Sequence, residues 1–169
     1  APTREERMRK PLTLDDAEAI GGLRSVEVAV PFLDISNNFF GGKLSVTGKN
    51  GKTSSSVQLQ GSTPNVDRAP GEVLVDGRWF SAGENEAKAN VCVIGDFVRE
   101  AYFPYESPLG QTIEVGGVEF RIVGLLQKRE QLFGGGGGNN DQTNVIYMPI
   151  NTALKLKPNA DDLFILAVA

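Results

Sequence analysis

The sequence predicts an α+β domain in which short helices pack on antiparallel hairpins. Apolar and polar residues alternate over short stretches, as they do in half-buried strands, and two pairs of these stretches flank glycine-containing turns. Helix-capping signals lie between the strands, and short helices alternating with hairpins are typical of the α+β class. A chain of 169 residues buries roughly 70% of its unfolded surface, so we expect one sizeable core, in one domain or one domain with an insert.

The first helix is predicted over residues 13–22. The Thr13 hydroxyl can accept a hydrogen bond from the amide near Asp16, and an acidic first turn suits the positive end of the helix dipole. A glycine pair is expected to end the helix. The residues expected to face inward are Leu14, Ala17 and Ile20.

A strand and a hairpin are predicted next. Three valines between residues 26 and 30 alternate with other residues and indicate a half-buried strand, which Pro31 is expected to end because proline lacks the N–H that a sheet needs. Residues 43–48 and 53–60 flank Asn50–Gly51, two residue types that tolerate positive φ. This arrangement is a strong hairpin signal.

The middle of the chain alternates short strands with short helices. Strands are predicted over residues 72–75 and 91–94, and Ser81 and Glu84 have the spacing of a capping box. Asp96 is expected to cap a helix that runs to residue 103. The residues expected on its buried side are Phe97 and Ala101, with Val98 and Tyr102 beside them.

A second hairpin and a long loop follow. Residues 111–115 and 118–126 are alternating stretches joined by Gly116–Gly117, which predicts a hairpin. The loop over residues 127–143 contains a run of glycines at positions 134–138. A glycine run loses much backbone entropy on ordering, so we expect a flexible surface loop.

Three short elements complete the predicted domain. They are a strand over residues 144–148, a helix from its N-cap Asn151 to Leu156, and a strand from Leu163 onward. The chain starts in a charged stretch and stops within an apolar run, so we expect further sequence on both sides in the native protein.

The sequence carries no residue set typical of catalysis, and we expect no catalytic, metal-binding or cofactor-binding residue. Histidine is absent and Cys92 is the only cysteine, which excludes His-dependent nucleophilic catalysis, a Cys/His zinc site and a disulfide within the chain. Cys92 lies in an apolar run and is expected to be buried in a strand. Acidic pairs such as Asp15–Asp16 and Asp161–Asp162 lack the alternation and turn glycine of a calcium loop.

Charge and hydropathy bear on two further classes of protein. The 17 basic and 21 acidic side chains leave a formal charge of −4, and a field of that sign repels nucleic-acid phosphates. No apolar run approaches the roughly 20 residues of a membrane-spanning helix. Residues 1–10 mix both charges and lack the apolar core of a signal peptide.

Aromatic residues gather at the ends of the predicted elements, beside glycine or proline. The groups are Phe39–Phe40, Trp79–Phe80 and Tyr102–Phe103 with Tyr105. This placement is typical of rings that close a core beneath turns, and a partner-binding surface is the alternative interpretation.

Several motifs appear in an order that resembles a known family. They are residues 73–80 (VLVDGRWF), 90–95 (NVCVIG), 101–104 (AYFP), 108–126 (PLGQTIEVGGVEFRIVGLL) and 145–149 (VIYMP). Together they resemble the MacB-like periplasmic core domain of ABC transporter permeases, within the FtsX-like permease superfamily. The resemblance runs from about Leu12 to Met148, and Pro104 departs from it where the family more often has glycine.

The resemblance implies two α+β subdomains, one inserted in the other. Residues 1–11 are then a juxtamembrane linker, and residues 12–60 the first part of a membrane-proximal subdomain. Residues 61–144 are the inserted, mostly-β subdomain with the flexible loop 127–143. Residues 145–169 return to the membrane-proximal subdomain, which is truncated at the C-terminus.

The resemblance also implies a function. The domain lies on the periplasmic side of the bacterial cytoplasmic membrane and relays ATP-driven motion of membrane helices to export or efflux of a drug, peptide or lipid. It is not itself an enzyme, because the ATPase is a separate domain or subunit. Implied partners are that ATPase, a second permease copy in a dimer, and a periplasmic adaptor or substrate protein, with no nucleic acid.

Other functions stay open at this point. A lipoprotein-releasing or FtsX-type regulatory permease shares the family architecture. A free-standing extracellular binding or adhesion module shares the hairpin chemistry, and an enzyme that uses carboxylates alone has no spacing that supports it. The presence of hydrophobic spans of about 20 residues on both sides of the domain distinguishes the transporter from the free-standing module.

Overall fold

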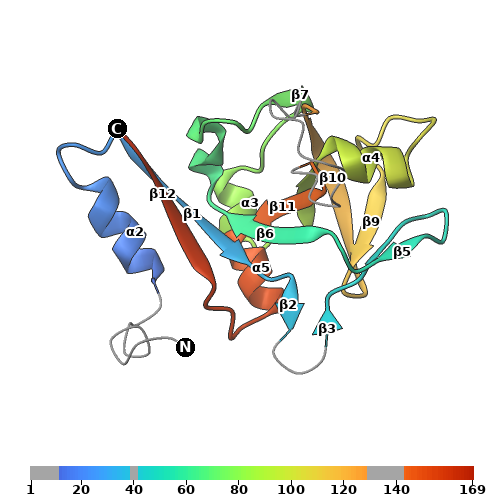
Figure 1. Cartoon of the computed structure of the whole chain (residues 1–169), viewed down its shortest axis with the longest axis horizontal. Coiled ribbons are helices and arrows are strands. Elements are labelled where there is room, and N and C mark those ends of the chain that lie inside the picture. Colours follow the sequence, from blue (N-terminus) through green and yellow to red (C-terminus); the bar gives the residue numbers. More distant parts are fainter. Residues whose placement is uncertain (1–11, 39–41, 129–142) are drawn as a thin grey trace, which may run out of the picture.

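The computed structural model describes residues 12–38, 42–128 and 143–169 (Figure 1). Its helices are α2 (Leu14–Gly21), the 3₁₀ helix η1 (Pro64–Arg68), α3 (Ala82–Glu86), α4 (Asp96–Tyr102) and α5 (Ile150–Leu156). Its strands are β1 (Val28–Asp34), β2 (Asn37–Asn38), β3 (Gly42–Lys43), β4 (Val46–Thr47), β5 (Thr53–Ser54), β6 (Gln58–Ser62), β7 (Leu74–Gly77), β8 (Val91–Ile94), β9 (Thr112–Val115), β10 (Val118–Leu126), β11 (Val145–Pro149) and β12 (Leu163–Val168). These short helices and mostly antiparallel strands confirm the predicted α+β class.

Within the described residues, one sheet of ten strands organises the domain. Its order is β12-β1-β6-β11-β8-β10-β9-β4-β5, with β7 beside β10. Two neighbouring pairs, β6–β11 and β8–β10, are parallel, and the sequence did not predict them. The pairs β1–β6, β1–β12, β8–β11 and β9–β10 are antiparallel. β11 lies between β6 and β8 and so joins the two sides of the sheet.

Local sequence signals placed several elements correctly. Thr13 caps α2 and exchanges hydrogen bonds with Asp16 in a capping box, and Ser81 and Glu84 do the same at the start of α3. The turn between β9 and β10 has positive φ at Gly116 and at its neighbour Gly117, as a tight hairpin requires. The predicted strand at 91–94 is β8, and the strand from Leu163 is β12, whose partner is β1.

The hairpin around Asn50 and Gly51 is confirmed, but it is shorter than predicted. Only β4 and β5 pair across this turn, in which Gly51 has a φ of +80°. The rest of the predicted second arm leaves the hairpin and becomes β6, which pairs with β1 and β11. The prediction of one continuous arm over residues 53–60 was wrong. Residues 58–62 pair with β1 and β11 inside the sheet, and not with the first arm of the hairpin.

Pro31 does not end the first strand, contrary to the prediction. β1 runs through it, and its pairing with β6 begins at Phe32. Pro31 therefore lies one residue before that pairing, where its missing N–H removes no bond to β6. Its carbonyl accepts a hydrogen bond of 2.8 Å from the Ser62 hydroxyl.

Two helix caps were predicted at the wrong residue. Gly95 is the N-cap of α4 and Pro149 that of α5, and neither gives a side-chain hydrogen bond. Asp96 instead accepts a hydrogen bond from Arg99 within α4. Asn151 instead contacts Asn85, which lies in α3. Asp96 therefore bonds to a side chain one turn later in its own helix, and Asn151 bonds to a residue far away in the sequence.

The predicted inward faces of two helices need correction. In α4, Val98 and Tyr102 are buried, whereas Phe97 is 42% exposed. In α2, Ala17 is buried but Leu14 is 38% exposed. A short helix covers the core with a narrow stripe, so residues at its margin stay in solvent.

The sheet has an apolar cluster on each face. Ile94 and Ile146 belong to one cluster, which α4 and α5 cover with Val98 and Ile150. Neighbouring strand residues point to the opposite face. The members of that second cluster include Val66 of η1, Phe80, Val93, Val145 and Tyr147. Each face of the central strands is therefore buried, which explains why β11 is apolar throughout.

The interpretation of the aromatic groups as rings that close the core is confirmed for the described residues, with one exception. Phe80, Tyr102 and Phe103 are buried, but Tyr105 is 98% exposed. Phe39 and Phe40 lie outside the described residues. So do residues 1–11 and the predicted glycine-rich segment within 129–142.

Candidate functional site

The groups singled out for chemistry in the sequence take structural positions. Cys92 is fully buried in β8, and this burial raises the pKa of its thiol, which disfavours the reactive thiolate. Asp16 and Glu84 are committed to capping boxes. Among the described residues, no group of three or more Cys, Asp or Glu side chains is arranged to hold a metal ion.

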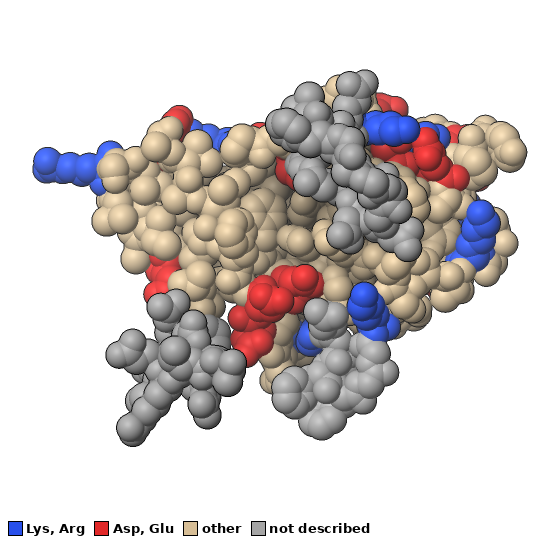
Figure 2. All heavy atoms as spheres, viewed as in Figure 1, with Lys and Arg blue, Asp and Glu red and all other residues tan. Residues whose placement is uncertain are grey.

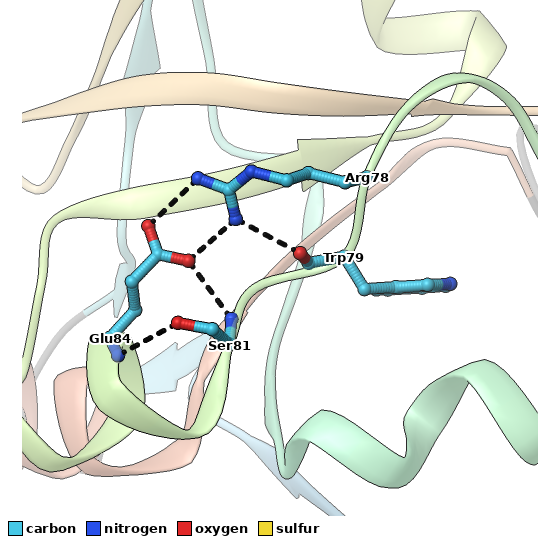
Figure 3. A network of polar contacts seen from close by, with 4 residues as sticks. All are labelled: Arg78, Trp79, Ser81 and Glu84. Carbon is cyan, nitrogen blue, oxygen red and sulfur yellow. Dashed lines mark hydrogen bonds and ion pairs between the residues drawn. The ribbon is translucent and has the colours of Figure 1, made fainter.

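A polar network at the end of β7 is the best-defined charged site (Figure 3). Arg78 donates two hydrogen bonds to the Glu84 carboxylate, from Nη1 over 2.6 Å and from Nη2 over 3.2 Å. The same carboxylate accepts the Ser81 amide over 2.9 Å, and the Ser81 hydroxyl accepts the Glu84 amide over 3.1 Å. Arg78 also donates to the carbonyl of Trp79. The guanidinium is thus held in place by a helix N-terminus.

Arg78 and Trp79 leave the chain in different directions, as Figure 3 shows. The Trp79 ring packs edge-on against Phe80 and Tyr147, with ring centroids 6.0 and 5.7 Å away. This packing fixes the backbone from which Arg78 extends. The hydrogen bonds between Arg78 and Glu84 raise the pKa of the guanidinium and lower that of the carboxyl, so both stay charged.

A pocket with a cavity volume of about 290 Å³ adjoins this network. Arg78 and Glu84 line one side, Arg121 is a second basic residue, and Leu109, Ile122 and Val123 supply apolar walls. The pocket lies where β10 changes partner, since residues 118–121 pair with β9 and residues 124–126 with β7. The pairing of β10 with β8 shifts register between Ile122 and Gly124, and such bulges often occur beside binding sites.

A second polar contact joins α5 to the segment 85–90, and we call it the α5 contact. The Asn151 amide donates to the Asn85 side chain over 3.0 Å, and the fully buried Thr152 hydroxyl donates to the Ala89 carbonyl over 2.7 Å. Lys155 Nζ donates to the carbonyl of Lys88 and to the side chain of Asn90, each over 2.9 Å. The φ of Lys88 is +52°, a left-handed value that the contact holds in place.

An apolar cleft lies between the start of α2 and the start of β12. Its cavity volume is about 470 Å³, and its lining includes Leu14, Leu33, Leu154 and Leu163. Asp161 also lines it. In the view of Figure 2, acidic side chains gather below the middle of the molecule, and most of the described surface is uncharged.

Sequence reasoning named no site residue, and it did not single out Arg78 or Arg121, which line the pocket beside the polar network. The capping box of Ser81 and Glu84 was recognised, but its pairing with Arg78 was not. An arginine six residues before a capping-box glutamate is the available signal. Arg121 has no local signal, because its neighbours in the pocket come from β8 and from the turn at Leu109.

The comparisons with known proteins identify the family. The model of the MacB-like periplasmic core domain matches residues 1–168. The chain belongs to this family. Recognition of the family from its motifs is therefore confirmed, and the chain is the periplasmic-type domain of a MacB-type ABC transporter.

Relatives of this MacB-like domain are much longer proteins. The macrolide export ATP-binding/permease protein MacB of Bdellovibrio bacteriovorus is 30% identical over 151 residues, which cover 89% of this chain and 21% of the relative. The pyoverdine export ATP-binding/permease protein PvdT of Pseudomonas putida is 31% identical over 146 residues, which cover 84% of this chain and 20% of the relative. The chain spans about a fifth of the length of these curated relatives.

Solved structures share the fold of the MacB-like domain. The periplasmic region of MacB from Actinobacillus actinomycetemcomitans superposes with a TM-score of 0.71 at 19% identity, over 97% of this chain and 82% of the other. The extracellular domain of the ABC-type transporter YknZ from Gram-positive bacteria gives a TM-score of 0.70 at 19% identity, over 99% and 80%. In the described part of the MacB-like domain, no helix has the length and apolar character needed to cross a bilayer.

Proposed function

We propose that this domain relays motion in a MacB-type exporter. It lies outside the bacterial cytoplasmic membrane between the first and second membrane helices of the permease. ATP hydrolysis in a separate domain or subunit moves those helices, and the domain passes the motion to the exported substrate or to a partner protein. The domain itself makes and breaks no covalent bond.

The observation that carries this proposal is the pairing of β1 with β12 at one edge of a continuous sheet. Six residues of each strand pair, from Val28 with Val168 to Leu33 with Leu163. These are the strands nearest the two ends of the described chain, and β1 also pairs with β6. Backbone hydrogen bonds join each strand to the next, and a tightly packed interior transmits strain. A displacement applied at either strand therefore reaches the rest of the sheet.

The α5 contact supports the same proposal. It joins residues 145–169, which we assign to a membrane-proximal subdomain with residues 12–60, to the inserted subdomain over residues 61–144. Thr152 is fully buried and bonds to Ala89 across this boundary. Such a contact moves the two subdomains together rather than letting α5 slide along the loop.

The names of the relatives suggest substrates and partners. Relatives are named as exporters of macrolides and of pyoverdine and as ATP-binding/permease proteins. We propose a small exported molecule as substrate, with the ATPase, a second permease copy and a periplasmic adaptor or substrate protein as partners. No residue of this chain is assigned to any of them.

The test uses the full-length transporter that contains this domain. The double variant Thr152→Val with Lys155→Met removes hydrogen bonds of the α5 contact, and we expect export to fall severalfold while ATP hydrolysis persists. The matched control is Thr47→Val with Lys49→Met, which removes solvent-exposed hydrogen bonds of the β4–β5 hairpin. We expect that control to export normally.

Hydrogen–deuterium exchange checks that the α5 contact has opened. If residues 85–90 exchange faster in the double variant and export stays at the wild-type level, the relay proposal is wrong. The gene for the full protein gives a separate check, because the proposal requires membrane spans of about 20 apolar residues on both sides of the domain.

A further inference from the structure

We propose that the pocket beside Arg78 binds the carboxylate of a small organic acid whose apolar body enters the cavity. We call it the Arg78 pocket. Its basic residues are Arg78 and Arg121, and its apolar walls are Leu109, Ile122 and Val123. The inference goes beyond the relay function, because a domain can transmit motion with this pocket empty.

The ion pair in the Arg78 pocket presents its positive partner to solvent. The Arg78 side chain is 57% exposed, whereas that of Glu84 is 22% exposed. Glu84 is also the partner that the α3 N-terminus holds, through the amide of Ser81. A ligand at the mouth of the pocket therefore meets a guanidinium whose orientation is already fixed. An arginine held in this way loses less conformational entropy when it binds an anion.

Arg121 is the second arginine that lines the Arg78 pocket. It forms no ion pair with any residue in the part of the chain that the structure describes. Glu119 lies two residues before it on β10 but does not line the pocket. Two guanidinium groups and one carboxylate leave a net positive charge at the pocket, in a chain whose formal charge is −4. The local charge therefore favours an anion against the field of the whole chain.

The apolar walls decide what kind of anion fits. Ile122 is fully buried, and Val123 lies at the register shift of β10, where the strand departs from regular pairing with β8. Leu109 closes the pocket from the turn before β9. A free inorganic anion leaves the partly exposed Leu109 and Val123 side chains in water, whereas a carboxylate on a short apolar body covers them. A cavity of about 290 Å³ admits a small body of this kind.

The test is a titration of the 169-residue chain with hexanoate, followed by amide chemical shifts in NMR spectra. We expect saturable shifts of Leu109, Gly110, Ile122 and Val123. The matched probe 1-hexanol has the same apolar body without the charge, and we expect no saturable shifts there at equal concentration. Acetate has the charge without the body, and we expect binding weaker than that of hexanoate.

Two variants assign the binding to the Arg78 pocket. Arg121→Gln removes one guanidinium at an exposed position, and we expect hexanoate to bind at least about tenfold more weakly. The control Arg68→Gln removes an exposed arginine that pairs with Glu27 elsewhere, and we expect unchanged binding. Equal responses to hexanoate and 1-hexanol, or equal affinity of Arg121→Gln and wild type, overturn the proposal. So does the absence of saturable shifts at these residues.

Discussion

The Tyr102 hydroxyl donates a hydrogen bond of 3.0 Å to the carbonyl of Val46, across 56 positions of the sequence. This bond ties the β4–β5 hairpin to α4. The ring lies so close to Gly48 that a Cβ there would be 2.3 Å from a ring carbon. Burial raises the pKa of the Tyr102 phenol, so the hydroxyl keeps its proton and remains a donor.

Replacing this donor is expected to weaken the attachment of the hairpin. Tyr102→Phe keeps the ring and removes the hydroxyl, and we expect the free energy of unfolding to fall by about 1 kcal/mol. Urea unfolding followed by circular dichroism measures the change. Tyr105→Phe is the matched control, because Tyr105 is 98% exposed and its hydroxyl should contribute nothing measurable. Equal stability of the two variants would show that the bond to Val46 is not formed.

Two glycines are expected to differ in how well they tolerate alanine. At Gly95, a Cβ would lie 1.9 Å from the backbone oxygen of Thr143, so Gly95→Ala should lower stability by about 1–3 kcal/mol or more. At Gly83 in α3 the nearest atom to a Cβ is 3.9 Å away, and alanine favours a helix. Gly83→Ala should therefore be neutral or slightly stabilising. Thermal unfolding of both variants tests the close contact between Gly95, the N-cap of α4, and the backbone of Thr143.

A charge at the centre of β10 is expected to unfold the domain. Ile122 is fully buried in the sheet, and Ile122→Asp places a carboxylate among apolar side chains. We expect a loss above about 4 kcal/mol, near the whole stability of a small domain. Arg121→Gln, one residue earlier and exposed, should stay within about 0.5 kcal/mol of wild type. A cooperative, wild-type-like transition for Ile122→Asp would mean that this strand is not part of the core.

Glu84 is expected to make stability depend on pH in the acid range. The hydrogen bond from Arg78 lowers the pKa of the Glu84 carboxyl below 4.5. As the pH falls, the carboxyl of the unfolded chain therefore binds a proton at a higher pH than that of the folded chain. Stability from this group is complete above pH 4.5 and is lost as the pH falls through the lower folded pKa. Glu84→Gln keeps a capping-box residue but removes the charge. We expect unfolding midpoints of wild type to fall more steeply below that pH than those of the variant.

Features that depend on neighbouring residues could be predicted from the sequence. The capping boxes at Thr13 and Ser81, and the hairpin at Gly116–Gly117, are each set by residues within four positions of one another. Their hydrogen bonds join residues close in the sequence and so do not depend on which distant segments pack against them. Alternating strands, hairpin turns and caps of this local kind are what predicted the α+β class.

Features that depend on distant partners could not be predicted. Pro31 stays within a strand because β6 begins to pair one residue later, and Asn151 bonds to Asn85 rather than capping α5. The parallel pairing of β6 with β11 joins segments that share no local signal. Arg121 enters the Arg78 pocket for the same reason, since β8 and the turn at Leu109 bring the other walls to it.

The place of β11 has a consequence for how the protein is made. A ribosome releases β6 and β8 well before residues 145–149, yet only β11 lies between them in the finished sheet. Until Pro149 emerges, the nascent polypeptide holds two separate groups of strands with open inner edges. Insertion of β11 is then a late, long-range step, and such steps slow folding and expose unpaired strands to aggregation during synthesis.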